Sequence, residues 1–178
     1  MTKAILINYD YCTGCHSCEV ACKNENGIAL GEYWNRVLQI GPHGTFPDLE
    51  QYWLPVQCQQ CEDAPCVHVC PTGASYRDAD GKVLVDKEKC IGCKYCMAAC
   101  PYGARIQIKA TGVVEKCRFC WEDGEPGNPP ACVGTCISGT RIFGDLDDPD
   151  CELVKEIAAT HAAPIAGDLT KSKVYYVR

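Results

Sequence analysis

Cysteine is the residue type in this chain with the greatest capacity for chemistry. The sequence contains 17 cysteines among 178 residues, and sixteen of them form four groups of four, with Cys151 left over. In chain order the groups are Cys12, Cys15, Cys18 and Cys22 (group one); Cys58, Cys61, Cys66 and Cys70 (group two); Cys90, Cys93, Cys96 and Cys100 (group three); and Cys117, Cys120, Cys132 and Cys136 (group four). Such a set of cysteines serves disulfides, zinc or iron–sulfur clusters.

The spacing within the groups favours iron–sulfur clusters. Groups one and three share the pattern C-x2-C-x2-C-x3-C, and group three ends in Cys100-Pro101, as in bacterial ferredoxin sequences. Three cysteines on a tight loop reach three irons of one cubane, while the fourth, at the start of the next helical turn, points away and binds the neighbouring cluster. Sixteen cysteines at four per cubane predict four [4Fe–4S] clusters.

The two other uses of cysteine fit the pattern less well. A structural zinc site closes one tetrahedron with two separated pairs, a spacing that groups two and four satisfy and groups one and three do not. A disulfide framework conflicts with the odd cysteine count. The chain starts MTKAILINYDYC, without a basic and then apolar leader, so we expect no Sec export signal and no oxidising compartment on that route.

The composition excludes several function classes. The formal net charge is −6 and no cluster of Lys or Arg stands out, so nucleic acid is not an expected partner. No apolar stretch approaches the roughly 18 residues of a membrane helix, so any membrane anchor belongs to another chain. The sequence has no Ser–His–Asp set, phosphate loop or dinucleotide glycine motif, and we expect a non-catalytic chain without a substrate site.

An internal repeat indicates how the cysteine loops are held. Residues 5–22 (ILINYDYCTGCHSCEVAC) align without gaps with residues 83–100 (VLVDKEKCIGCKYCMAAC). Each copy opens with a short apolar strand and ends in a helix-like segment, EVAC or MAAC. Gly14 and Gly92 stand between the first two cysteines, where glycine fits a backbone that turns tightly with its N–H groups free to meet sulfur.

Groups two and four are each followed by a small turn and a strand. PTGASYRDADGKVLV is typical of a hairpin with Asp80-Gly81 at its tip, and ISGTRIFGDL of a turn followed by a strand. The fold class predicted is α+β, with two bacterial ferredoxin-like modules. Each module would have a small sheet and short helices over two clusters.

The pairing of the groups predicts that one module is inserted in the other. Groups two and three are joined by the short hairpin and share the Cys-Pro ending, which groups one and four lack. The strand RIFG after group four should then lie near the strand ILIN before group one. The expected boundaries are residues 1–24 plus 112–146 (module A), 25–57 (connecting insertion), 58–111 (module B) and 147–178 (C-terminal docking extension).

The segments without ligands have their own predicted elements. WNRVLQIG and YWLPVQ are expected to be strands around a Gly/Pro loop, GPHGTFP. Asp150 is a plausible N-cap for a helix over CELVKEIAAT. The last segment, KVYYVR, is expected to be a strand. Their simplest role is scaffold or docking surface.

Several sequence motifs in the chain resemble those of one known family. CVHVCPTGA, CIGCKYCMAACPYGAR, EKCRFC and RIFGDLDDP, together with the order of the groups and the long gap in group four, resemble the iron–sulfur subunit of the dimethyl sulfoxide reductase family of molybdopterin oxidoreductases. The compact subunit of polysulfide, thiosulfate, tetrathionate and dimethyl sulfoxide reductases is the most similar. Group two reads CQQC where that family commonly has Asn-His, and group four ends CIS in place of CPT, but neither difference removes a ligand.

The resemblance implies a ligand set for each of four clusters in a line. The sets are Cys12, Cys15, Cys18 and Cys136 (cluster 1); Cys58, Cys61, Cys66 and Cys100 (cluster 2); Cys90, Cys93, Cys96 and Cys70 (cluster 3); and Cys117, Cys120, Cys132 and Cys22 (cluster 4).

The resemblance also implies a role in anaerobic respiration. The chain would pass electrons between a large catalytic subunit with a molybdenum or tungsten pterin cofactor (bis-MGD type) and a quinone-linked membrane subunit or another carrier. Sulfur oxyanions, S-oxides, nitrogen or arsenic oxyanions and phenolic compounds all stay open as terminal substrates. The alternative is a soluble polyferredoxin or a subunit of a hydrogenase-type complex. The expected location is the cytoplasm, or outside it if a partner with a twin-arginine signal carries the folded chain.

Other polar residues lie beside the ligands. His16 and His68 are interpreted as cluster surroundings, because the cysteine sets are already complete without them. Four cations lie beside ligands: Lys94, Arg105, Lys116 and Arg118. They are interpreted either as charges that raise the potential of a neighbouring cluster by offsetting its negative charge, or as solvated surface charges or salt bridges to a partner. Cys151 is interpreted as a plain free thiol.

Overall fold

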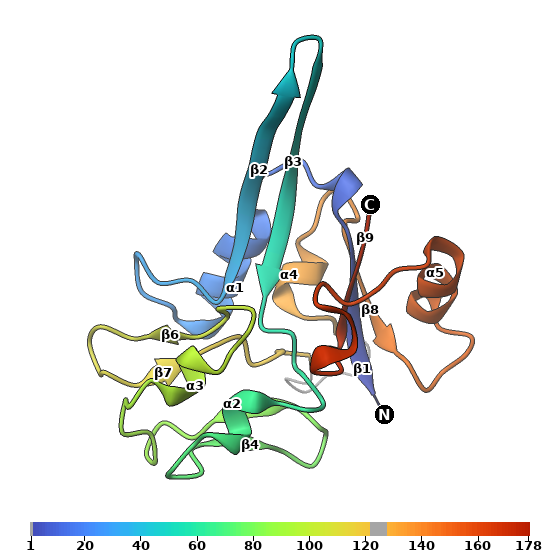
Figure 1. Cartoon of the computed structure of the whole chain (residues 1–178). Helices are drawn as coiled ribbons and strands as arrows, with labels where there is room; N and C mark the ends of the chain where they lie inside the picture. Colours follow the sequence, from blue (N-terminus) through green and yellow to red (C-terminus); the bar gives the residue numbers. More distant parts are fainter. Residues whose placement is uncertain (1, 122–127) are drawn as a thin grey trace.

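The computed structural model describes residues 2–121 and 128–178. Within these residues small sheets and short helices surround the cysteine loops (Figure 1), which confirms the α+β fold class. Residues 122–127, which form much of the Gly- and Pro-rich gap of group four, lie outside the described part. The nesting and the boundaries of the two modules stay predictions.

A three-stranded sheet joins the start of the chain to its end. Strand β1 (Lys3–Asn8) lies between β8 (Arg141–Asp145), with which it is antiparallel, and β9 (Val174–Val177), with which it is parallel. The expected neighbours ILIN and RIFG are therefore paired, with Ile5 opposite Phe143. The predicted C-terminal strand is also present, as β9.

Strand β1 is buried on both faces, and its alternating side chains face two different cores. Ala4 and Leu6 pack with Leu153 of helix α5 (Glu152–Thr160), whereas Ile5 and Ile7 belong to a core that contains cysteines. Figure 1 shows α5 on one side of the sheet and the cysteine-bearing helices on the other. The sheet therefore separates the cysteine loops from a core that contains none of the sixteen grouped cysteines, here called the metal-free core because no cluster is expected in it.

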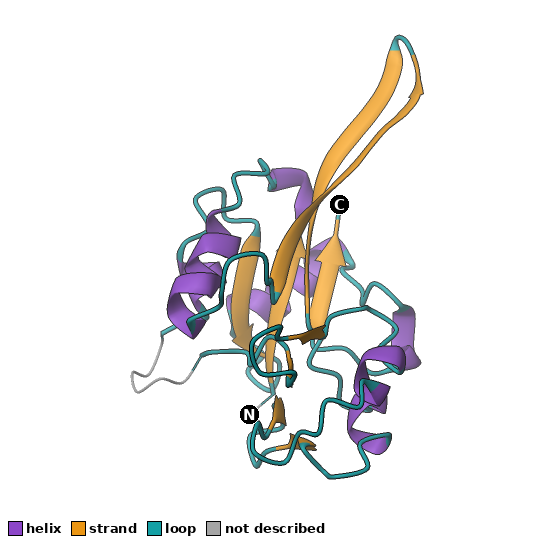
Figure 2. Ribbon diagram, turned by 90° about the vertical axis from the view of Figure 1, so that its left-hand side faces the viewer, coloured by secondary structure: helices purple, strands orange, loops and turns teal. Residues whose placement is uncertain are grey.

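The long hairpin of β2 (Asn35–Thr45) and β3 (Asp48–Gln57) extends well beyond the rest of the chain (Figure 2). The predicted loop over residues 41–47 is wrong, because both strands continue almost to Phe46 and Pro47. A shift of register between Ile40 and His43 accommodates Gly41-Pro42 within the ladder. Proline lacks a backbone N–H and is tolerated in sheets at such irregularities.

Two smaller hairpins carry the loops of groups two and three. Strands β4 (Ser75–Arg77) and β5 (Val83–Val85) pair antiparallel, as predicted from the Asp80-Gly81 tip. Strands β6 (Ile106–Gln107) and β7 (Val114–Glu115) form a second hairpin that the sequence patterns did not indicate. Its strands are only two residues long, too short for a visible alternation of apolar and polar residues.

Four helices carry cysteines at or near their ends. They are α1 (Ser17–Asn26), α2 (Pro65–His68), α3 (Tyr95–Ala98) and α4 (Ala131–Gly134). Helices α1 and α3 confirm the helix-like segments EVAC and MAAC. Helix α1 is longer than expected and ends where Gly27 adopts a left-handed conformation (φ 60°), which suits glycine after a helix.

Helix α5 confirms the predicted C-terminal helix but not its cap. The N-cap residue is Cys151, and no side chain caps the helix. The Asp148 carboxylate accepts a hydrogen bond from the Asp150 N–H (2.9 Å), so a turn holds Asp150 just before the helix.

No helix within residues 2–121 and 128–178 has the length and apolarity that crossing a membrane requires. Two 3-10 turns, η1 (Tyr9–Tyr11) and η2 (Gly167–Leu169), complete the elements.

Candidate iron–sulfur sites

All seventeen cysteines lie in the described residues as free thiols. Cys12, Cys15, Cys18 and Cys136 line one cavity. The first three come from the loop after β1 and the first turn of α1, while Cys136 comes from the segment just after α4. Cys15 is exposed and Cys18 is buried, so this cavity reaches from the surface toward the core.

A second cavity lies deeper and is lined by Cys22, Cys117, Cys120 and Cys132. Cys22 lies one helical turn after Cys18 on α1, so one helix supplies a thiol to each of two adjacent cavities. Burial raises the pKa of Cys22 to about 12, and the nearby Cys132 and Cys120 thiols contribute to the rise. Such a thiol stays protonated at neutral pH unless a cation binds beside it.

A third cavity is lined by Cys70, Cys90, Cys93 and Cys96. Cys93 is exposed, in the same way as Cys15 at the first cavity. Cys70 comes from the end of group two, and the other three thiols come from the loop before α3 and from α3 itself.

The remaining four thiols also lie together. Burial raises the pKa of Cys61 to about 11, and the nearby thiols of Cys58, Cys66 and Cys100 contribute to the rise. The structure thus brings together the members of each of the four expected sets. In every set, three thiols come from one group and the fourth from its partner group.

The same backbone conformation recurs in all four loops. The residue before the second cysteine has a positive φ in each group: Gly14 (67°), Gln60 (48°), Gly92 (68°) and Phe119 (60°). A left-handed residue turns the chain so that successive N–H groups point into the loop, toward an acceptor. Sequence reasoning found only the two glycines, because glutamine and phenylalanine rarely adopt this conformation.

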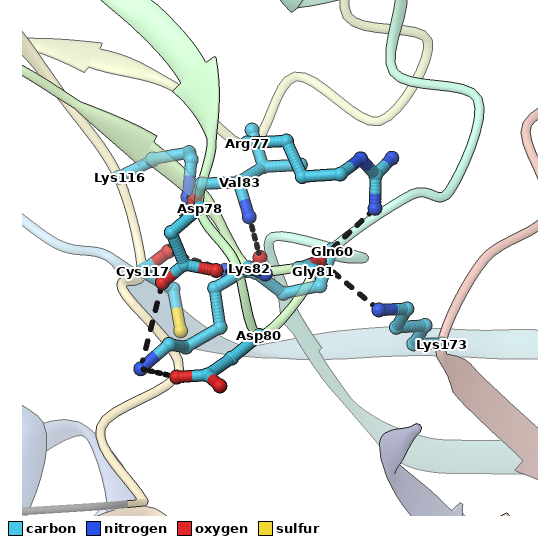
Figure 3. A network of polar contacts seen from close by, with 10 residues as sticks. All are labelled: Gln60, Arg77, Asp78, Asp80, Gly81, Lys82, Val83, Lys116, Cys117 and Lys173. Atoms are coloured by element: carbon cyan, nitrogen blue, oxygen red, sulfur yellow. Dashed lines mark hydrogen bonds and ion pairs between the residues drawn. The ribbon is translucent and has the colours of Figure 1, made fainter. Parts of the chain in front are cut away.

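Gln60 is held in this conformation by hydrogen bonds at both ends of its buried amide (Figure 3). Its Nε2 donates to the Cys117 carbonyl oxygen (2.9 Å), and its Oε1 accepts from the Val83 N–H (2.8 Å). Lys116 Nζ donates to the same Cys117 oxygen (2.7 Å) and also contacts the Val83 carbonyl oxygen. The network therefore ties the loops of groups two and four to the β4–β5 hairpin.

Replacement of Gln60 by leucine is expected to lower the free energy of unfolding of the cluster-loaded chain by about 1–3 kcal/mol. The substitution keeps the approximate size but leaves the buried Val83 N–H without its partner. Anaerobic urea titration measures the change. The matched control is Gln51→Leu, at an exposed site in β3, which should change stability by no more than about 0.5 kcal/mol. Equal effects of the two substitutions would contradict the role of the amide.

The cavities also contain buried donors that fit a sulfide-rich group. Asn35 Nδ2 and Gln57 Nε2 have no hydrogen-bond partner and line the second cavity, and Arg105 Nη1 has none and lines the third. A buried donor without a partner is costly, so an acceptor inside each cavity would stabilise it. The bridging sulfides of an iron–sulfur cluster are such acceptors, and the residues present fit the group.

Backbone N–H groups donate to two of the cysteine sulfurs. The Ser75 N–H lies 3.3 Å from Cys70 Sγ, and the Phe119 N–H lies 3.4 Å from Cys117 Sγ. Within the described residues no three Cys, His, Asp or Glu side chains converge on a point that would hold a single metal ion. Three of the four sets of thiols instead line a cavity each, an arrangement that suits one polynuclear group per cavity.

The other residues singled out in the sequence have different surroundings. His16 lines the first cavity, contacts Glu19 (3.2 Å) and packs edge-on against Trp53. His68 is exposed and lies 3.7 Å from Asp63. Cys151 packs beside the metal-free core.

Of the four cations, Lys94 lines the third cavity and Lys116 and Arg105 are buried. Arg118 donates to Asn26 Oδ1 (2.6 Å). Sequence reasoning missed Arg141, which is buried between two cavities. The signal was present, because Cys100 and Cys136 both begin the pattern C-x2-G-x-R.

Known proteins share both the cysteine loops and the rest of the chain. Residues 49–146 match the 4Fe-4S dicluster domain family. The chain belongs to this family. Its relatives include a provisionally named dimethyl sulfoxide reductase iron–sulfur subunit of Halobacterium salinarum, which is 41% identical over 203 residues, covering 97% of this chain and 78% of the relative.

Two further relatives extend the range of reductases. The arsenate respiratory reductase iron–sulfur subunit ArrB of a Shewanella species is 34% identical, covering 100% of this chain and 97% of the relative. The thiosulfate reductase electron transfer subunit PhsB of Salmonella typhi is 46% identical, covering 79% and 74%. The resemblance to the iron–sulfur subunits of these reductases is confirmed. This chain is therefore an iron–sulfur electron-transfer subunit.

Proposed function

We propose that this chain holds four [4Fe–4S] clusters and conducts electrons between a molybdopterin catalytic subunit and a quinone-linked membrane subunit or another carrier. The observation that carries the proposal is the grouping of thiols: sixteen cysteines surround four sites, and each site takes one thiol from a different group. This exchange is typical of two-cluster ferredoxin modules. The ligands proposed for each cluster are those of the four sets given above.

When bound, each [4Fe–4S] cluster supplies a centre that takes up and releases electrons. The protein residues hold it and shield it. Cysteine thiolates bind the irons, and the N–H groups of Ser75 and Phe119 donate to ligand sulfurs. Buried walls such as Phe119, which is 2% exposed, exclude water from the inner sites.

Contacts between ligands of different sets support one order for the sites. Cys18 of the cluster 1 set and Cys22 of the cluster 4 set lie one turn apart on α1. Cys58 of the cluster 2 set lies in the same core as Cys22 and Cys117 of the cluster 4 set. Arg105 hydrogen-bonds Cys66 and lines the cavity of Cys90. The proposed line therefore runs from cluster 1 through clusters 4 and 2 to cluster 3.

The two ends of this line are the sites with exposed ligands. Cys15 at cluster 1 and Cys93 at cluster 3 are the exposed members of the sixteen. Electron exchange with a partner requires a cluster close to the surface, so we assign the two docking regions to the surroundings of these two thiols. The two inner sites would serve only to relay electrons between them.

The relatives support a partner of the molybdopterin type. Their names include reductases of dimethyl sulfoxide, arsenate and thiosulfate, each with this chain's counterpart as the iron–sulfur or electron transfer subunit. We infer that the chain is located where its catalytic partner is: in the cytoplasm, or outside it when that partner is exported through a twin-arginine signal. Isolation of the chain in a stable complex with a pterin-containing subunit would support the proposed catalytic partner. Isolation of the chain as a lone soluble polyferredoxin would contradict it.

The cluster count has a direct chemical test. Anaerobically purified chain is expected to contain about sixteen irons and about sixteen acid-labile sulfides. The expectation follows from sixteen ligands at four per cubane. A content near eight irons in fully loaded protein, or stoichiometric zinc, would overturn the assignment. The variant Cys151→Ser is the control, because this thiol is outside every set and its loss should leave the iron content unchanged.

A further inference from the structure

Two arginines occupy matching positions after the cysteine groups. Arg105 ends CPYGAR after Cys100, and Arg141 ends CISGTR after Cys136. Both residues are only 4% exposed. A buried guanidinium keeps its positive charge, so each needs negative or strongly polar partners inside the protein.

Arg141 lies between the first and second cavities. Its Nη2 is 3.8 Å from Cys18 Sγ, and its Nη1 is 3.8 Å from Cys132 Sγ. The first thiol belongs to the set of cluster 1 and the second to the set of cluster 4. Two neutral oxygens complete its surroundings: Gln57 Oε1 at 2.5 Å and Asn35 Oδ1 at 2.9 Å.

Arg105 has the corresponding place in the other half of the chain. Its Nη2 donates to Cys66 Sγ (2.9 Å), which belongs to the set of cluster 2, and to Ser75 Oγ (2.6 Å). The side chain also lines the cavity of cluster 3, and its Nη1 has no partner. Each arginine therefore contacts the ligands of one pair of sites.

The local charges make these contacts important. Among the described residues no Asp or Glu forms an ion pair with Arg105 or Arg141; their polar partners are thiols, amide oxygens and a hydroxyl. An uncompensated buried cation is strongly unfavourable. A cubane with four thiolate ligands carries net negative charge, and the charge of the site is one of the factors that set its reduction potential.

We propose that Arg105 and Arg141 are shared tuning residues, each of which raises the reduction potentials of both clusters in its own pair. Arg141 acts on clusters 1 and 4, and Arg105 on clusters 2 and 3. A fixed positive charge favours the reduced state, which carries the extra electron. Because each charge lies between two sites, it shifts the reduction potentials of both clusters in the same direction. The difference in potential between the two clusters of a pair therefore stays small. The inference rests on the proposed four-cluster function.

The test is a redox titration of the cluster-loaded chain followed by electron paramagnetic resonance. Arg141→Gln should lower the potentials of two of the four clusters, and Arg105→Gln those of the other two. We expect at least about a tenfold change in the equilibrium constant for one-electron reduction, or about 59 mV. The signature is that the two affected pairs do not overlap, so it requires no prior assignment of spectra.

Matched variants separate charge from structure. Arg141→Lys and Arg105→Lys keep the charge and should retain most of the wild-type potential. Arg36→Gln removes an arginine that is exposed and should shift none of the four. Where a glutamine variant fails to load clusters, Gln57→Glu and Ser75→Asp place a carboxylate against the intact arginine and should lower the same pairs.

The outcomes are distinct. Equal shifts of all four clusters, shifts of the same clusters by both arginines, no shift, or equal effects of lysine and glutamine would each overturn the inference. A wild-type chain without four clusters would instead overturn the proposed function on which the inference rests.

Discussion

Removal of the clusters is expected to abolish cooperative folding of the chain. Cysteines form much of the buried core. Cys22, Cys58 and Cys117 pack in one core with Ile5 and Ile7 of strand β1. Cys61, Cys66 and Cys96 belong to a second core, formed around groups two and three. Without clusters the buried thiols of Cys22, Cys117 and Cys96 would line cavities with no bound group. Metal-binding free energy is folding free energy in small domains of this kind.

The metal-free elements are too small to compensate. Helix α1 has ten residues, and isolated helices shorter than about 12–15 residues are marginal in water. The β2–β3 hairpin projects from the body, and an isolated two-stranded hairpin is marginally stable. Only the sheet of β8, β1 and β9 with α5 has a core without any of the sixteen grouped cysteines. Among the described residues that core has four buried members, Ala4, Leu6, Leu153 and Ala162, and six partly buried side chains pack against them.

Circular dichroism of anaerobic samples measures this effect. The loaded chain should show a sharp thermal transition, and the chain stripped of iron should show weak secondary structure and no sharp transition. Reloading with iron and sulfide is the control and should restore the transition. If the stripped chain unfolds cooperatively near the temperature of the loaded chain, the clusters do not hold the fold together.

The sequence predicted correctly those local elements for which the order of residues in a short segment favours a single structure. The apolar runs around Ile5 and Val83 form strands, and the turn at Asp80-Gly81 closes a hairpin. The cysteine spacing predicted which thiols lie on one loop, and the fourth cysteine of each group lies apart from the other three, near another group. These features depend on short segments, in which turn chemistry and alternation leave few alternatives.

The remaining features depend on distant parts of the chain. Gln60 and Phe119 adopt left-handed conformations because their surroundings hold them there, which propensity alone does not indicate. Gln60 is fixed by partners near residues 83 and 117. The length of the β2–β3 hairpin depends on a register shift between Ile40 and His43, which no sequence pattern predicted. The shared C-x2-G-x-R pattern marks Arg141 in the sequence, but only the fold shows its contact with Cys18, more than a hundred residues away.

The replacement of Cys22 by serine is expected to disturb the cluster bound by cysteines at the other end of the sequence. Cys22 lines the cavity of Cys117, Cys120 and Cys132, although it follows Cys18 on α1 by one turn. Serine has nearly the same size but binds iron poorly, so the change removes one ligand with little change in volume. The iron content should fall from about sixteen to about twelve if the cubane is lost, and one set of paramagnetic signals should change.

The matched substitution in the other half of the chain is Cys100→Ser. Cys100 lies close to Cys61, so this variant should disturb the cluster of Cys58, Cys61 and Cys66 and leave the site around Cys90 intact. The two variants should therefore change different signals, and the double variant should change both. Cys151→Ser, outside all four sets, should change neither.

The result would also test the nested arrangement of the two modules. The whole connecting insertion (25–57) and the whole proposed inner module (58–111) lie between Cys22 and Cys117 in the sequence. A shared cluster therefore requires residues 1–24 and 112–146 to fold as one unit. If the signals lost in Cys22→Ser belong to the cluster of Cys12, Cys15 and Cys18, groups one and four do not exchange ligands. The proposed order of electron transfer, from cluster 1 through clusters 4 and 2 to cluster 3, would then be wrong as well.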